Sequence, residues 1–561
     1  MIDYYMKHFF SEFLLPVTIL CTGILFTACK EPAVTTAGAA SKERPNILWL
    51  VTEDISPYLA AYGDSTAFTP NLNRLAKEGI VFTRCFDVSG VCAPSRSSLI
   101  TGMYPSGIGT DNMRTGQVFT KTGLPAYSVV LPPEVKMFSQ LMREGGYYCT
   151  NNDKQDYQFK GLAAGWDESS KTAHWRNRPP GKPFFSVFNF GVTHESQIWA
   201  KKNDTLLVDP AKVPLPPYYP ESPVIRRDVA RMYSNIMEMD KQVGKLLDQL
   251  EEDGLLDKTI IVFYSDNGGP LPRGKREIYE SGIHVPLMIR FPNKKYAGTI
   301  NDELVSFVDF ASTMLSLAGL PVPAYMQGRP FLGAQKSIAP RKYVFAARDR
   351  MDSEYDMVRA VRDKRYEYIR NFHPELPYIQ EIEYRKQMDL MQELLRFEKE
   401  GKLNAVQQLW FRKSKPVEEL YDTKSDPFEL RNLAGDSSFG AKLNELRFAL
   451  DQWMRYTEDK GFISEKDLLE SMWPGMNQPV TARPLFIQNG TVSIRCSTPG
   501  SAISWQMLDT GQKINEHGWQ LYQHPLTVPF GKRLMAISER IGYKTSDIEE
   551  FVPVNDGSAS R

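Results

Sequence analysis

Three separated apolar runs, each followed by polar side chains, constrain the fold more than any other feature. The runs cover residues 46–51, 183–190 and 259–264 and are rich in aromatic and β-branched side chains. Continuous apolar runs of this length are typical of strands that are buried on both faces of a parallel sheet. Open α/β sheets bind their ligands at the carboxyl ends of such strands. The sequence therefore predicts an α/β fold with a functional site at that edge.

The residues that follow the three runs are of types that bind metal ions or transfer protons. Glu53 and Asp54 follow the first run, His194 follows the second, and Asp266 and Asn267 follow the third. Carboxylate and amide oxygens are hard ligands suited to calcium, and histidine exchanges protons near neutral pH. Taken singly, these residues also fit a solvated acidic loop, a structural histidine and an ordinary turn. Together, the two acidic strand ends favour a site.

Regular structure is also predicted elsewhere. Helices are expected over 69–79, where Thr69 and Pro70 start the helix and Gly79 ends it, over 223–254, and over 378–402. After residue 475 the pattern changes to short strands separated by turn residues, at 491–496, 502–507, 520–522 and 534–538. These short strands predict a small β-sandwich, which is either a carbohydrate contact or a packing cap.

Length and charge limit the class of protein. The 561 residues are enough for more than one domain, and 67 basic residues balance 67 acidic ones. A net charge of zero gives no support for a nucleic-acid partner or for a charged membrane-binding surface. If the substrate is an anion, the positive field that binds it must be local.

The N-terminal segment predicts export. Lys7 precedes an apolar run over 13–26, and the residues up to Cys29 resemble a relaxed lipoprotein cleavage box. Residues 1–29 are therefore expected to be a signal peptide, with Cys29 lipidated and residues 30–44 as a tether. This predicts a periplasmic or cell-surface lipoprotein that meets the membrane only through its lipid anchor, and a plain signal peptide is the alternative.

Residues 92–102 form the most distinctive motif. Cys92 is followed by Pro94 and Arg96, and the segment ends in Thr101 and Gly102. A buried packing cysteine beside a proline turn is the ordinary interpretation of such a segment. No two of the six cysteines have metal-ligand spacing, so neither a zinc site nor a disulfide framework is indicated.

This motif resembles the signature of the sulfatase family, and further blocks resemble the same family in the same order from about residue 45 to 461. The resemblance implies an alkaline-phosphatase-like α/β fold, in which helices flank a central mixed sheet. It implies a catalytic domain at 45–340 and a smaller C-terminal subdomain at 341–475. The small β-sandwich at 480–561 resembles one that is appended to some hexosaminidases and bacterial sulfatases.

The resemblance also assigns roles. It implies that a formylglycine-generating or sulfatase-maturating enzyme oxidises Cys92 to formylglycine (3-oxoalanine), and that Arg96 stabilises this group. Lys154, His194 and Lys275 would bind sulfate and take part in catalysis. The implied calcium ligands are Glu53, Asp54, Asp266 and Asn267, with the modified Cys92 or a sulfate oxygen closing the shell.

Four positions depart from the family pattern. Glu53 stands where the family has aspartate, which changes the reach of that carboxylate. Asp156 stands where many members have the histidine of a Lys-x-His motif, and is either a substrate-specific replacement or a residue that orients Lys154. Ser281 replaces a glycine and His284 an arginine in the block that contains Lys275.

Four basic residues are candidates for the substrate rim. Arg114 lies just beyond the motif, and Arg348, Arg350 and His373 lie in a basic, aromatic-rich region. Guanidinium groups suit carboxylate or sulfate recognition. A surface loop for Arg114 and a solvated strand face for the others are the alternatives.

The sequence therefore predicts an enzyme that hydrolyses sulfate esters, or an N-sulfate, of a carbohydrate such as a glycosaminoglycan or an algal polysaccharide. A phosphoesterase of the same superfamily is a second hypothesis, since phosphate and sulfate are both tetrahedral. A catalytically inactive glycan-binding lipoprotein is a third.

Overall fold

A computed structural model describes residues 44–515 and 518–553, and within them the central sheet is mixed and has nine strands. β1 (Asn46–Thr52) pairs in parallel with β5 (Phe184–Phe190) on one side and with β6 (Thr259–Ser265) on the other. β7 (His284–Arg290) is antiparallel to both β6 and β2 (Ile80–Phe86). The three apolar runs are therefore strands of this sheet, as predicted. The remaining strands are β3 (Tyr148–Asn152), β4 (Glu168–Ser169), β8 (Thr299–Asn301) and β9 (Val305–Ser306).

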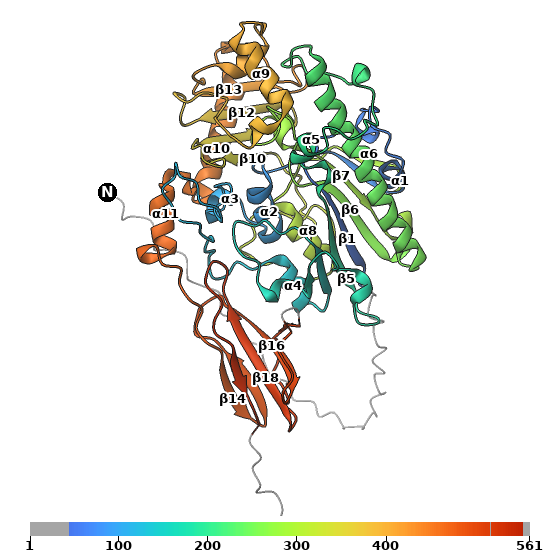
Figure 1. The fold of residues 1–561 in the computed structure, drawn as a ribbon, viewed down its shortest axis with the longest axis vertical. Coiled ribbons are helices and arrows are strands. Elements are labelled where there is room, and N and C mark those ends of the chain that lie inside the picture. Colours follow the sequence, from blue (N-terminus) through green and yellow to red (C-terminus); the bar gives the residue numbers. More distant parts are fainter. Residues whose placement is uncertain (1–43, 516–517, 554–561) are drawn as a thin grey trace, which may run out of the picture. The chain divides into compact units, whose positions relative to one another are not determined.

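Helices cover both faces of the sheet because successive side chains of β1 point to opposite sides. Ile47 and Trp49 belong to the core on one face, and Leu48 and Leu50 belong to the core on the other. Figure 1 shows α6 and α1 on one side of the sheet and α2 and α8 on the other. The predicted helices at 69–79 and 223–254 are confirmed as α1 and α6. The helices of this part are α1 (Pro70–Glu78), α2 (Cys92–Thr101), α3 (Pro105–Ile108), α4 (Phe138–Glu144), α5 (Ser196–Ala200), α6 (Pro223–Glu252), α7 (Glu280–Ile283) and α8 (Asp309–Leu317).

A second, antiparallel sheet follows the first. Helix α10 packs on it, with the rings of Phe345 and Trp453 stacked at 5.1 Å. The predicted helix at 378–402 is wrong in its first half, since the helix there begins only at Asp389. The preceding segment instead reaches buried partners: Gln380 accepts a hydrogen bond from Arg348. The elements here are β10 (Val344–Arg348), β11 (Val358–Arg362), β12 (Tyr366–Asn371), α9 (Asp389–Lys399), β13 (Glu418–Asp422), α10 (Gly440–Thr457) and α11 (Glu465–Met472).

Two small antiparallel sheets end the described chain (Figure 1). One pairs two strands and the other pairs four, and they share a core that includes Val492, Ile494, Leu534 and Ala536. The four strands predicted after residue 475 are present, whereas the first and last strands were missed. The strands are β14 (Leu485–Asn489), β15 (Thr491–Arg495), β16 (Ala502–Asp509), β17 (Gln520–Leu521), β18 (Lys532–Glu539) and β19 (Glu549–Phe551).

The predictions for the signal peptide, for Cys29 and for nearly all of the tether concern residues 1–43, which lie outside the described residues. None of the described helices is both long and apolar enough to cross a membrane. The boundaries proposed near residues 340 and 475 stay predictions, because the chain from Arg44 onward clusters as one unit.

Candidate active site

Two parallel strands end side by side at the candidate active site. β1 and β6 stay in register up to Thr52 and Ser265, so the residues that follow them meet. The backbone N–H of Asp54 donates to Asp266 Oδ1 over 3.2 Å, and Asn267 Nδ2 donates to Asp54 Oδ1 over 3.0 Å. All three side chains are fully buried. The structure therefore brings together the two strand ends that the sequence singled out.

Helix α2 places Cys92 beside these strand ends. Cys92 is its first residue, and every residue of the helix is buried. One turn later, Arg96 Nε donates to Asp266 Oδ2 over 2.8 Å and Nη1 donates to Asn189 Oδ1 over 2.8 Å. Burial raises the pKa of the Cys92 thiol to about 12, although Lys154 acts in the opposite direction. The unmodified thiol is thus protonated and weakly nucleophilic at neutral pH.

Two lysines bring positive charge to the same place. Lys275 Nζ lies 2.7 Å from Asp54 Oδ2, and Lys154 Nζ lies 2.7 Å from Glu53 Oε2. Burial by itself lowers the pKa of both lysines, but the negative groups around them outweigh this effect and raise it. Both lysines are therefore cationic at neutral pH and suited to binding an anion.

His194 lies between these charges. Its Nε2 is 3.8 Å from Glu53 Oε2, and its Nδ1 is 2.8 Å from Ser196 Oγ. Burial, followed by the positive charge of Lys275, lowers the pKa of His194 to about 2. The sequence predicts a histidine that titrates near neutral pH, whereas the imidazole in this environment is neutral. A nearby negative charge would be needed to favour its protonated form.

Asp156 contacts the two groups on either side of it. Its Oδ2 lies 3.6 Å from Lys154 Nζ, and the Cys92 side chain is close enough to help lower the pKa of its carboxyl group. Burial acts to raise the pKa of Asp156, but Lys154, Arg96 and Arg114 together lower it. These contacts favour a residue that orients Lys154, the second of the two interpretations that the sequence allows.

Glu195 and Arg276 complete this charge network, and the sequence analysis gave neither a role. Arg276 binds Glu195 through two nitrogens, at 2.8 and 2.7 Å, and Lys275 Nζ lies 3.3 Å from Glu195 Oε1. The backbone N–H of Glu195 donates to Asp54 Oδ2 over 2.7 Å. The sequence does contain one signal for these residues: each of them directly follows a predicted site residue, His194 or Lys275.

Four side chains of the candidate site carry oxygen atoms of the type that binds a divalent cation. Glu53, Asp54, Asp266 and Asn267 offer buried oxygens, the kind of ligand that calcium prefers. Within the described residues Asn267 Oδ1 and Arg96 Nη2 are buried without a hydrogen-bond partner. No described group of three or more His, Cys, Asp or Glu is arranged to hold a metal ion, and the carboxylates instead face the cations above. The four residues therefore offer the type of donor atom that calcium prefers. One of these atoms, Asn267 Oδ1, has no hydrogen-bond partner among the described residues.

Arg114 lies close enough to Cys92 to interact with a negative charge at that position. Its Nε is 3.4 Å from Asp352 Oδ1, and its guanidinium lies 5.8 Å from the centre of the Tyr384 ring. Because Arg114 is only partly exposed, it lies at the edge of the site and not on a free surface loop.

The other three rim candidates have different surroundings. Arg348 Nη1 lies 2.7 Å from Asp356 Oδ2, and Arg350 Nε lies 2.6 Å from Glu465 Oε2, all of them buried. The solvated strand face is therefore wrong for both arginines. His373 is half-exposed. Among the described residues, none of the three makes a hydrogen bond or ion pair with Cys92, and their role in substrate binding stays a prediction.

Solved structures share this fold. One is a protein in complex with its substrate D-glucosamine-2-N,6-O-disulfate, which matches with a TM-score of 0.55 at 19% identity over 74% of this chain and 98% of that chain. The phosphonate monoester hydrolase of Agrobacterium radiobacter matches with a TM-score of 0.55 at 18% identity over 75% and 99%. These likenesses concern the fold alone, and with the sheet topology they define an alkaline-phosphatase-like α/β protein.

Sequence comparison identifies the family. The sulfatase family model matches residues 45–181 and 167–320, and the model for the C-terminal part of N-sulphoglucosamine sulphohydrolase matches residues 273–409. An ulvan-active sulfatase of Formosa agariphila is 47% identical over 96% of this chain and 97% of that protein. The chain belongs to the sulfatase family and is an enzyme that hydrolyses sulfuric esters.

Proposed function

We propose that this sulfatase removes sulfate from a carbohydrate, as an O-sulfate ester or an N-sulfate, with formylglycine at residue 92 and a calcium ion. One observation carries this proposal: Cys92 lies at the start of a buried helix, near the buried Lys275, the partly buried Lys154 and four potential oxygen ligands. The name of the Formosa relative supports a polysaccharide such as ulvan. The match to N-sulphoglucosamine sulphohydrolase supports the N-sulfate alternative and a glycosaminoglycan.

The two absent groups would supply the chemistry that the side chains lack. Formylglycine at residue 92 would supply a hydroxyl nucleophile for sulfur and a way to release the sulfate afterwards, neither of which a thiol offers. Calcium, held by Glu53, Asp54, Asp266 and Asn267, would polarise a sulfate oxygen as a Lewis acid.

The chain's own residues would bind the sulfate group and orient it at residue 92. Lys154 and Lys275 are cationic and lie near residue 92, where they can neutralise sulfate oxygens. Arg96 anchors α2 to Asp266. Lys275 holds a proton that it can give to the leaving oxygen, whereas His194, neutral in this structure, needs the negative charge of bound sulfate before it can do the same.

Sulfate release is the decisive measurement. We expect the exported protein to release sulfate from p-nitrophenyl sulfate and from ulvan oligosaccharides. Cys92→Ala should lower kcat/KM by roughly 10⁵-fold or more, because the nucleophile is lost. Cys149→Ala, at an equally buried cysteine in β3, is the matched control and should stay active. Full activity of Cys92→Ala would reject the covalent role.

Two further measurements separate the other hypotheses. A phosphoesterase would hydrolyse p-nitrophenyl phosphate better than p-nitrophenyl sulfate, and the proposal predicts the reverse. An inactive glycan-binding protein would bind ulvan oligosaccharides without releasing sulfate. Mass spectrometry of the tryptic peptide that contains residue 92 would then show an unmodified thiol.

Export is part of the proposal. The apolar segment before Cys29 supports a lipoprotein of the periplasm or cell surface, and the maturation enzyme that oxidises Cys92 is the implied protein partner. Mass spectrometry of the mature N-terminus tests the anchor: a diacylglycerol-modified Cys29 supports it, and a free N-terminus at another residue contradicts it.

A further inference from the structure

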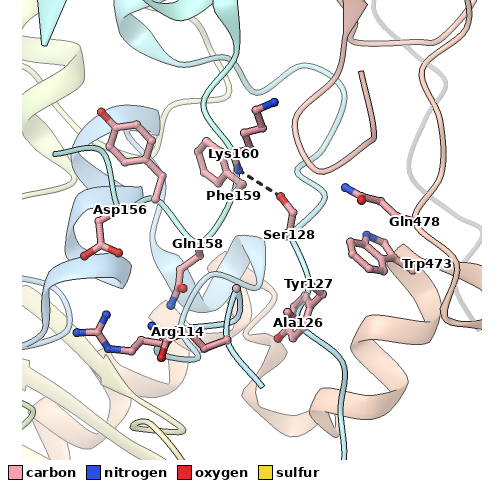
Figure 2. A pocket seen from close by; sticks show the side chains of 13 residues that line it. Arg114, Ala126, Tyr127, Ser128, Asp156, Gln158, Phe159, Lys160, Trp473 and Gln478 are labelled. Carbon is pink, nitrogen blue, oxygen red and sulfur yellow. Dashed lines mark hydrogen bonds between the residues drawn. The ribbon is translucent and has the colours of Figure 1, made fainter. Parts of the chain in front are cut away.

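A cavity of about 470 Å³ adjoins the candidate active site. Arg114 and Asp156, which interact with Cys92, form its near wall. Trp473 and Gln478, far along the chain, form part of its opposite wall (Figure 2). Pockets of roughly 300–1,000 Å³ commonly hold small ligands. The cavity therefore gives the active site room for more of a substrate than its sulfate group.

The near wall has an unusual backbone. Arg114, Asp156 and Gln158 have φ values of 62°, 55° and 60°, a region that residues other than glycine rarely adopt. The surrounding fold holds them there: Thr115 N–H donates to Gln158 Oε1 over 3.2 Å. Such backbone strain gathers at functional sites and survives only where neighbouring contacts fix it. Its concentration along one cavity indicates a wall whose shape matters.

The small β-sandwich makes hydrogen bonds in or near the other walls of the cavity. Its Glu539 accepts a hydrogen bond from the backbone of Ala163 over 2.8 Å, and Arg540 donates to the carbonyl of Leu131 over 3.1 Å. These two backbone positions lie three residues beyond wall residues Lys160 and Ser128. Gln478 Nε2 donates to the carbonyl of Gly542 in the sandwich over 3.0 Å. The sandwich thus contacts three separate wall segments.

The lining chemistry suits a sugar. Ser128 and Gln478 offer hydroxyl and amide groups, and Arg114 and Lys160 offer positive charge. Trp473 offers an aromatic wall, and its buried indole N–H has no hydrogen-bond partner among the described residues. A polyhydroxylated ring with an anionic substituent can use all three kinds of group.

We propose that this cavity is the subsite for the sugar unit next to the sulfated one, and that the C-terminal β-sandwich holds its walls in position. The substrate is then a sulfated oligosaccharide or polysaccharide chain, of which the enzyme binds at least two units. This inference rests on the proposed function. It makes the β-sandwich a positioning element of the active site.

A pair of glycines in the sandwich provides a matched test. Gly542 has φ of 87°, and a Cβ there would lie 2.5 Å from the Val129 carbonyl oxygen, next to wall residue Ser128. Gly531 has φ of 81° with nothing within 4 Å of such a Cβ. Gly542→Ala and Gly531→Ala therefore carry a similar backbone cost, and only the first pushes against the cavity wall.

The measurement compares a ulvan tetrasaccharide fraction with p-nitrophenyl sulfate, which has no second sugar. We expect wild type to favour the tetrasaccharide in kcat/KM. Gly542→Ala should reduce that preference at least tenfold, mainly through KM for the tetrasaccharide. Gly531→Ala should leave the preference unchanged. Circular dichroism and thermal melting confirm that both variants are folded.

A second pair covers the case in which Gly542→Ala fails to fold. Lys160→Ala should lower the preference for the tetrasaccharide, and Lys171→Ala, at an exposed lysine that does not line the cavity, should not. Sulfate release from p-nitrophenyl sulfate without any preference for the tetrasaccharide, or with a preference that neither Gly542→Ala nor Lys160→Ala changes, would overturn the subsite alone. Absence of sulfate release from both substrates would instead overturn the proposed function.

Discussion

Two networks of ion pairs in this protein are similar in burial, but we expect one to act in catalysis and the other to stabilise the fold. The active-site network surrounds Cys92, and the subdomain network joins Arg348, Asp356 and Lys415 near the second sheet. Both contain ion pairs almost without solvent exposure, Lys275 with Asp54 in the first and Arg348 with Asp356 in the second. In the active-site network Asn267 Oδ1 and Arg96 Nη2 lack partners among the described residues, and a cavity adjoins it. In the subdomain network each guanidinium nitrogen of Arg348 meets an acceptor.

Burial and ion pairing therefore do not distinguish a catalytic site from a structural one. A buried charge is costly unless it is paired, so both networks must satisfy their charges to fold at all. A cavity does not distinguish them either, because Asp356 of the subdomain network lines one of about 880 Å³. The two networks differ in the unsatisfied atoms of Asn267 and Arg96, which, among the described residues, only the active-site network contains.

Among the changes that compare the two networks, the largest expected effect comes from Asp54→Asn in the active-site network. The change removes the negative charge of a candidate calcium ligand, and with it the charge that pairs with Lys275. We expect kcat/KM for p-nitrophenyl sulfate to fall by roughly 10³-fold, since a bound metal supplies several kcal/mol of charge stabilisation. Calcium content per chain, measured by mass spectrometry after dialysis, should fall with it. Unchanged calcium content would contradict the role assigned to Asp54.

The same isosteric change in the subdomain network should affect stability instead. Asp356→Asn leaves Arg348 and Lys415 without their shared carboxylate. We expect a loss of about 3 kcal/mol in the free energy of unfolding, because an uncompensated buried charge is strongly destabilising. Urea denaturation measures this loss. Activity per folded molecule at low temperature should stay within threefold of wild type, and a large loss of kcat would make the two networks functionally alike.

A smaller effect is expected at Asp228, a buried carboxylate on α6 that has no ion-pair partner within 4 Å among the described residues. It accepts a hydrogen bond from the backbone of Leu390 over 2.7 Å, and burial raises its pKa to about 7. The native state therefore holds this proton more tightly than the unfolded chain does. The resulting stability is complete below about pH 4 and is lost as the pH rises through 7.

Asp228→Asn should remove this pH dependence, because the amide keeps the acceptor without the charge. We expect the variant to be more stable than wild type at pH 8, where the wild-type carboxylate is ionised and buried, with a difference that shrinks toward pH 4. Urea denaturation at pH 5, 6, 7 and 8 measures the difference. A constant difference across this range would show that Asp228 carries no shifted proton.

The sequence is most informative where local pattern and position coincide. The apolar runs fixed β1 and β6, and their parallel register placed Asp54 beside Asp266. The three- and four-residue spacing of apolar side chains in the same way predicted α6. The paired strand ends and the cysteine motif, together with the resemblance to sulfatases, led to the candidate site without any long-range contact being known.

Other features depend on contacts that a linear pattern does not contain. Glu195 meets Lys275 from a segment 80 positions away, and nothing in the residues between them signals that pairing. The segment before Asp389 has helical composition, but its Gln380 side chain is bound by Arg348 in the second sheet. The positive φ of Arg114 is equally invisible, because glycine is the usual marker of that conformation.

The complete burial of α2 has a consequence for how the active enzyme is made. Cys92 has no exposed surface in the folded chain, so a second protein cannot reach its sulfur. Under the formylglycine proposal, the enzyme that converts this side chain would have to act before α2 packs into the fold. Refolding a purified thiol form would then give a folded protein without activity, if the proposal is right.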